Sequence, residues 1–235
     1  MCDFFSFITT DKGDYLYLNA EQRKKMGFKR ADSHSKIAEV YYKNNKGSII
    51  NAYEYNPLTK RLVLVSEMFE EDLNKVKDWC LNLDFKTIVP ELIIKPIINP
   101  FEIDCKEVTQ QDIDNLKEWA RVRDSVGDSV WVGVRDSVGA RIIDIVWASV
   151  WHSVRASVRY SVRASVWDSV RDSVWAYISS FFNLDGKWKG FENVKGNPFQ
   201  CCIDLWEKGL VPSYDGGVWR LHSKNGVVYE REVEK

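Results

Sequence analysis

The chain has 235 residues, of which 45% are hydrophobic and 29% are charged, and its formal net charge is −1. This composition is ordinary for a soluble globular protein and excludes an intrinsically disordered chain. A net charge so close to zero also excludes a global field that would steer the protein to nucleic acid or to an acidic membrane.

The opening residues and the cysteines predict a cytoplasmic protein. Residues 1–14 contain neither a basic segment nor a long apolar run, so no signal peptide is expected. No stretch reaches the roughly 18 apolar residues of a membrane span. The five cysteines include no CxxC pair, which favours a reduced protein over a disulfide scaffold.

Residues 1–108 predict a mixed α+β domain. Aromatic and β-branched residues fill 2–9 and 15–19, and these two candidate strands flank the turn sequence DKGD. Further along the chain, short helices are expected at 21–27 and 33–43.

The rest of this domain predicts a strand and an amphipathic helix. The strand covers 61–69, after the turn sequence NPLTK. In 70–85, apolar residues recur at helical spacing behind an acidic start. Three prolines then break LIIKPIINPFEI into short extended pieces, which we expect to form a buried crossing strand or a packed linker.

A four-residue repeat occupies the middle of the chain. From Arg123 to Ile178 the sequence divides into fourteen tetrads, most of which end in Ser-Val or a close variant. A period of four is too short to be a folding unit, so it must be a surface pattern on one element. A helix that begins near Thr109, a candidate N-cap, leads into the repeat. We expect 109–182 to form a single repeat segment.

The repeat could be a long helix or a β-solenoid. Val, Ser, Asp and Trp each disfavour helix by about half a kcal/mol relative to Ala, so packing must stabilise a helix made of them. However, no Gly, Pro or Asn occurs from Ala140 to Phe182, and the corners of a solenoid usually need those residues. The sequence therefore favours a helix, with the β-solenoid as the alternative.

On a helix, residues four apart form a ridge that winds right-handedly around the axis. The winding valine ridge looks too long for one small domain to cover, so we expect a homo-oligomer that forms through the repeat, with i±4 ridges interdigitated. Gly127, Gly133 and Gly139 predict a kink or break in the first third of the repeat.

Residues 183–235 predict a C-terminal helix followed by a β-hairpin. The helix covers 198–209, and the hairpin joins 218–222 to 227–232 through a turn that contains Asn225-Gly226. The expected fold class is therefore α+β.

The repeat, the opening CDFFSF and the closing PFQCCIDLWEKGLVPSYDGGVWRLH resemble uncharacterised proteins encoded by bacteriophages and prophages. Those proteins carry similar D/A-S-V tetrads before a similar closing segment. The resemblance covers most of the chain and implies a phage-linked setting in the cytoplasm of a host cell. It has no implication for catalysis.

Two residues are weak catalytic candidates. Cys2 would become the N-terminal residue after removal of Met1, which resembles the start of N-terminal-nucleophile amidohydrolases. His34 lies within Asp32-Ser33-His34-Ser35, but catalytic triads are assembled by the fold rather than by adjacency in sequence. The simpler interpretations are a small residue at a strand start and a helix N-cap cluster. His222 is a conceivable partner for His34.

The first position of the tetrads carries the candidate binding residues. Interleaved Trp and Arg can stack on bases and bind phosphates, or can form cation–π contacts with a partner helix. Asp residues elsewhere in the tetrads argue against a general nucleic-acid surface. The ridge consists of Trp147, Trp151, Arg155, Arg159, Arg163, Trp167, Arg171 and Trp175.

No metal or cofactor is expected, because the three histidines are scattered and the common nucleotide-binding loops do not occur in the sequence. The leading hypothesis is a non-enzymatic, phage-linked interaction protein that oligomerises and blocks or sequesters a host protein or a small nucleotide. The alternatives are an enzyme that uses Cys2 or His34, and nucleic-acid binding through the Trp/Arg ridge.

Overall fold

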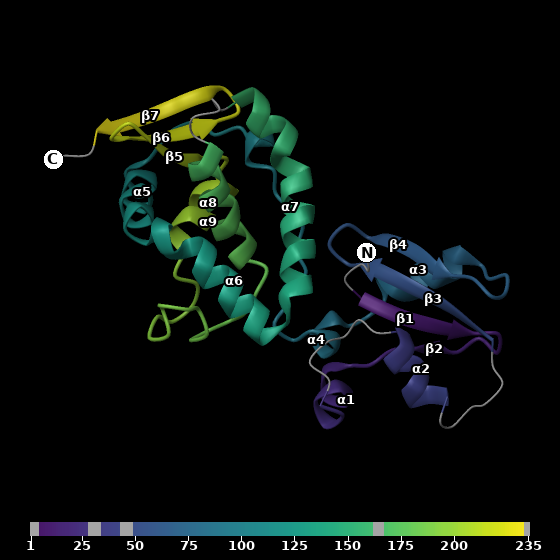
Figure 1. Ribbon diagram of the computed structural model, residues 1–235. Coiled ribbons are helices and arrows are strands. Elements are labelled where there is room, and N and C mark those ends of the chain that lie inside the picture. The colour runs from purple at the N-terminus through teal and green to yellow at the C-terminus, as the bar shows by residue number, and fades with distance from the viewer. Residues whose placement is uncertain (1–4, 28–33, 43–48, 162–166, 233–235) are drawn as a thin grey trace. The chain divides into compact units, whose positions relative to one another are not determined.

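The structure is a computed structural model that describes residues 5–27, 34–42, 49–161 and 167–232; for residues 42, 158–161 and 167–169 it describes the backbone alone (Figure 1). The chain divides into two compact units, Met1–Ile94 and Lys95–Lys235. Within the described residues, no helix is both long and apolar enough to span a membrane.

The first unit is built on an antiparallel sheet with strand order β2-β1-β3-β4. Phe5, Phe7 and Thr9 alternate with Ser6, Ile8 and Thr10 along β1, and all six side chains are buried. Both faces of this strand are therefore covered. The strands are β1 (Phe5–Thr10), β2 (Tyr15–Leu16), β3 (Ile50–Asn56) and β4 (Arg61–Ser66).

Helices cover the two faces of this sheet. On one face, Ile37 of α2 packs against Ile8, Leu18 and Ala52. On the other face, Trp79 of α3 packs against aromatic rings of β1 and β2. The helices of this unit are α1 (Ala20–Lys25), α2 (His34–Tyr42), α3 (Leu73–Leu81) and α4 (Phe85–Ile88).

The second unit contains the repeat as helices. Thr109 caps α5 through a capping box with Asp112, as the sequence suggests. The α+β class and the helical form of the repeat are thus confirmed. The helices are η1 (Pro100–Glu102), α5 (Gln110–Val122), η2 (Arg123–Ser125), α6 (Val126–Ser137), α7 (Ala140–Ser161), α8 (Trp167–Ser179) and α9 (Gln200–Glu207).

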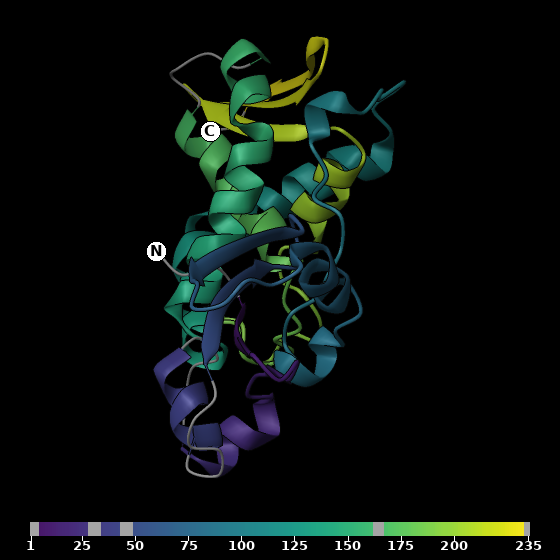
Figure 2. The same ribbon diagram turned by 90° about the vertical axis from the view of Figure 1, so that its right-hand side faces the viewer.

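The repeat forms several helices that pack on one another, rather than a single rod. Gly139 follows α6 with φ +102°, a conformation that only glycine adopts at low cost, and the chain reverses there into α7. The predicted break in the first third of the repeat is therefore found. Helices α6, α7 and α8 pack against one another within the same chain (Figures 1 and 2).

The fourth tetrad position forms the core between these helices. Wherever the structure describes its side chain, this position is buried. The described part of the valine ridge is thus covered inside one chain. The buried residues are Val126, Val130, Val134, Val138, Ile142, Val146, Val150, Val154, Val170, Val174 and Ile178.

A three-stranded antiparallel sheet lies at one end of helices α6, α7 and α8, and its order is β5-β6-β7 (Figures 1 and 2). Strands β6 (Val218–Ser223) and β7 (Gly226–Glu232) are the expected hairpin. The additional strand β5 (Val211–Asp215) pairs with β6 across the turn at Gly216 and Gly217.

The proline-rich segment before α5 packs as a strap on the repeat helices. Asn99 donates from Nδ2 to the Ser157 hydroxyl at 3.0 Å and to the Ser153 carbonyl at 3.4 Å. The Tyr177 hydroxyl accepts from the Ile98 amide at 2.8 Å. The packed linker expected for this segment is therefore present, and it covers the serine side of α7.

Candidate functional site

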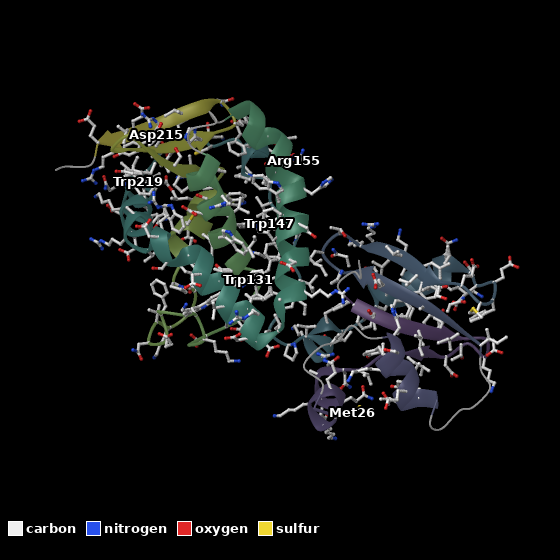
Figure 3. All side chains as sticks on the ribbon, in the orientation of Figure 1. Met26, Trp131, Trp147, Arg155, Asp215 and Trp219 are labelled. Atoms are coloured by element: carbon white, nitrogen blue, oxygen red, sulfur yellow. The ribbon has the colours of Figure 1, made fainter. Side chains whose placement is uncertain are left out.

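The first part of the Trp/Arg ridge lies on α7, where Trp147 and Arg155 are labelled in Figure 3, and its last residues belong to α8. The rings of Trp147 and Trp151 stack, with centroids 5.7 Å apart and planes 19° apart. Both side chains are half-buried, and Arg155, one turn further on, is exposed. No ion pair of Arg155 occurs within the described part of the chain.

Three other residues expected in this ridge cannot be placed in the site. Arg159 belongs to α7 by its backbone, and Trp167 is the first residue of α8. The side chains of both, and the whole of Arg163, lie outside the described residues. The described site therefore consists of Trp147, Trp151 and Arg155.

Equivalent positions in the other repeat helices have structural roles. Arg123 lies over the rings of Tyr214 and Trp219, at 5.3 Å and 5.4 Å from their centroids, and holds the start of the repeat on the C-terminal sheet. Trp131 of α6 meets Trp175 of α8 edge to face, with centroids 6.5 Å apart. These first tetrad positions therefore make a cation–π contact at Arg123 and a ring contact between Trp131 and Trp175 within the chain.

A second ridge runs beside the first along the outside of α7. It holds the second tetrad position, and four of its five described side chains in α7 are exposed, while Ala140 at the start of the helix is half-buried. Small alanines dominate it, with one acidic end and a central histidine. The exposed members are Asp144, Ala148, His152 and Ala156.

Of the two weak catalytic candidates, the structure describes only His34. His34 donates from Nε2 to the backbone carbonyl of Tyr53 at 2.8 Å, which fastens the start of α2 to β3. Cys2, Asp32 and Ser33 lie outside the described residues.

A serine–histidine pair that the sequence does not reveal lies in the C-terminal sheet. Ser213 Oγ and His222 Nε2 are 2.6 Å apart, which is hydrogen-bond distance for a nucleophile and its base. Both side chains are buried, and Nδ1 of His222 has no hydrogen-bond partner among the described atoms. Burial, together with Arg220, lowers the pKa of His222 to about 4. The two residues meet only because β5 pairs with β6.

The buried cysteines are thiols rather than thiolates. Burial raises the pKa of Cys80 and of Cys201 to about 12, and it raises the pKa of Cys202 as well. A thiol that stays protonated at neutral pH is a poor nucleophile and a poor metal ligand.

A hydrogen-bond network around Glu71 closes one end of the first sheet. Oε2 of Glu71 accepts from the hydroxyls of Thr9 at 2.6 Å and Tyr53 at 2.9 Å, and Oδ1 of Asn51 accepts from the amides of Met68 and Phe69. Burial and the carboxylate raise the pKa of Tyr53. The network holds the segment before α3 onto the sheet. The sequence does not reveal it, because Thr9, Asn51 and Tyr53 lie far from Glu71 along the chain.

No metal site is apparent in the described residues, where no group of three or more His, Cys, Asp or Glu side chains converges. Comparisons with protein-family models, with curated proteins and with solved structures gave no match. The α7 surface is therefore the candidate that combines exposed aromatic area with an unpaired charge.

Proposed function

We propose that the protein is a non-enzymatic interaction protein that binds an acidic partner through the exposed side of α7. The observation that carries this proposal is the stacked, half-buried Trp147–Trp151 pair beside the exposed Arg155. Trp and Arg dominate the energetics of protein interfaces, because both combine large apolar area with a directional polar group.

The surroundings of Arg155 favour an acidic partner. Arg159 follows Arg155 by four residues on α7, and like charges four residues apart on a helix repel each other. No carboxylate within the described residues pairs with Arg155. A partner carboxylate or phosphate would relieve this repulsion.

Burial argues against catalysis at the groups that the structure describes. The Ser213–His222 pair is enclosed, so a substrate has no route to the hydroxyl. The thiols of Cys80 and Cys201 stay protonated at neutral pH, because their pKa values lie near 12. Cys2 remains a candidate nucleophile, for which a thiol-reactivity assay is the test.

The setting proposed for this interaction is the cytoplasm of a phage-infected host. It rests on the resemblance of the tetrads and the closing segment to phage-encoded proteins. The partner is a host protein, a small nucleotide or a further copy of the chain, which would make the protein a homo-oligomer. Nucleic acid is the alternative ligand, but the exposed Asp124, Asp128, Asp136 and Asp144 at the second tetrad position disfavour a phosphate backbone.

Fluorescence anisotropy with three probes tests the proposal: a labelled poly-glutamate peptide, a labelled single-stranded oligonucleotide and a labelled ATP analogue. The peptide should bind the unmodified protein at low salt and bind Arg155→Gln several-fold more weakly. Arg121→Gln is the matched control, since Arg121 is exposed and paired with Glu118 on α5. Equal peptide binding by Arg155→Gln would contradict the proposal, and preferential binding of the oligonucleotide would favour the nucleic-acid alternative.

A further inference from the structure

Two neighbouring ridges on the outside of α7 differ in size. Trp147, Trp151 and Arg155 form a ridge of large side chains, and the ridge beside it contains Ala148 and Ala156. A bulky ridge next to a small-residue ridge is a knob-and-groove surface, and two helices with the same surface can pack into each other.

The two exposed charges of this surface lie at opposite ends of it. Asp144 and Arg155 are eleven residues apart, which is about 16 Å along a helix. Both are exposed, and neither forms an ion pair with any residue that the structure describes. The surface therefore has an acidic end and a basic end.

We propose that α7 binds α7 of a second copy of this chain, antiparallel to it and related by a two-fold axis. This inference rests on the proposed function, because it takes the exposed side of α7 as the binding surface. It identifies the acidic partner of Arg155 as Asp144 of the partner subunit.

One alignment of the two helices brings the charged and the large side chains of this surface opposite suitable partners. In an antiparallel pair with a two-fold axis, residues at equal distances on opposite sides of the axis face each other. With the axis between positions 149 and 150, Arg155 faces the partner subunit's Asp144. The same axis puts Trp151 against the partner subunit's Ala148, a large residue against a small one, and Trp147 against the partner subunit's His152. Symmetry repeats each of these pairs.

The charges also select the direction of packing. In a parallel pair, Arg155 would face Arg155 of the partner subunit, and Asp144 would face the partner subunit's Asp144. Like charges that face each other across an interface are unfavourable, whereas the antiparallel pair forms two ion pairs. The antiparallel arrangement is therefore the one that this surface specifies.

The other sides of α7 are already occupied within the chain. Val146, Val150 and Val154 are buried among the repeat helices. Ser153 and Ser157 contact Asn99 of the strap. The surface described here is the side of α7 that remains exposed.

The dimer should be weak and sensitive to salt. One helix from each copy buries less than the about 800 Å² per partner that is typical of a stable complex. Its ion pairs are solvent-accessible, so added salt screens them. We expect association in the micromolar range at low ionic strength, measured by sedimentation velocity.

Charge-reversal variants test the register. Asp144→Arg carries two positive residues on the surface, and Arg155→Glu carries two negative ones. Each variant alone should therefore associate about tenfold more weakly than the unmodified protein. A mixture of the two variants should form a heterodimer, because both facing charge pairs are then attractive. The double variant Asp144→Arg/Arg155→Glu should associate as the unmodified protein does.

Arg121→Glu, a reversal of an exposed charge on α5, is the control and should leave association unchanged. Circular dichroism checks that each variant is folded, and Asp144→Asn with Arg155→Gln serve as neutral replacements for any variant that is not. A monomeric unmodified protein, single reversals that associate normally, or a mixture without heterodimer would each overturn the inference. If poly-glutamate binding still depends on Arg155 in that case, the proposed function stands with another partner.

Discussion

Ser213 and His222 form a hydrogen bond of 2.6 Å between neighbouring strands, and both side chains are buried. Because the enclosed imidazole of His222 cannot be hydrated, its pKa falls to about 4, with Arg220 adding to the shift. The pair ties β5 to β6, and it makes the stability of the second unit depend on pH.

The stability of the protein should fall as the pH drops from about 6.5 to about 4. Above pH 6.5, the imidazole of His222 is neutral in both the folded and the unfolded state. Within this pH range, the unfolded chain binds a proton that folded His222 does not, which costs up to roughly 3 kcal/mol. Urea unfolding at several pH values measures the loss.

His222→Gln should remove this part of the pH dependence while lowering the stability at pH 7. His152→Gln, on the exposed side of α7, is the control and should keep the dependence. If the stability of His222→Gln fell with pH as steeply as that of the unmodified protein, groups other than His222 would cause the loss of stability in acid.

The periodicity of the repeat predicts much of the fold, because four-residue spacing without Gly, Pro or Asn is compatible with a helix and not with solenoid corners. The capping box of Thr109 and Asp112 and the break at Gly139 follow from local chemistry and are found. Periodicity does not reveal what covers a ridge. The packing of α7 against α6 and α8 depends on tertiary contacts between segments far apart in sequence.

The same distinction, between local patterns that the sequence shows and tertiary contacts that it does not, applies to the candidate site. The Trp/Arg ridge is visible in sequence, because its spacing is local. The pairing of Ser213 with His222, and of Glu71 with Thr9, is not visible, because the partners are brought together by strand pairing and loop packing. Nor does the sequence show that Arg123 stacks on Tyr214, since one repeated position has different neighbours in each helix.

Val150→Asp should unfold the second unit, because it puts a carboxylate at a fully buried position between the repeat helices. The expected cost is several kcal/mol, about the whole stability of a small domain. Ala148→Asp, two residues away on the exposed side of α7, should cost no more than about 1 kcal/mol, most of it the lower helix propensity of Asp. Thermal unfolding followed by circular dichroism compares them, and equal losses would contradict the orientation of α7.

Asp112 should stabilise the junction of α5 and α9 through Lys208 and Thr109. Burial opposes its ionisation, but hydrogen bonds from Lys208 and from the Thr109 amide and hydroxyl outweigh burial, so its pKa lies below the usual value. A lowered pKa stabilises the folded state above the pKa of the unfolded chain, and this contribution is lost as the pH falls through the folded value.

Asp112→Asn should therefore cost about 1–3 kcal/mol at pH 7 and progressively less in strong acid. The difference in the free energy of unfolding between variant and unmodified protein, measured against pH, is the readout. A difference that stays constant down to acid pH would rule out the charge of Asp112 as its source.

Two glycines of the repeat should respond in opposite directions to replacement by alanine. Gly139 has φ +102° at the reversal between α6 and α7, so Gly139→Ala should destabilise the protein by about 1–2 kcal/mol. Gly127 lies inside α6, and an added Cβ would meet the Trp175 side chain at an ordinary 3.9 Å. Gly127→Ala should stabilise by up to about 1 kcal/mol, since alanine favours helix. Equal effects in thermal unfolding would contradict the break at Gly139.

The central claim is that the tetrads bury their valines against one another within a single chain, which leaves the outer ridges of α7 for a partner. Unfolding of the Arg155→Glu variant, measured by denaturant titration from nanomolar to micromolar protein, tests this claim most directly. The unfolding midpoint should not depend on protein concentration, because folding that is complete within one chain is unimolecular. A midpoint that falls steadily on dilution would show that the valine ridge is buried between chains, and would contradict the account.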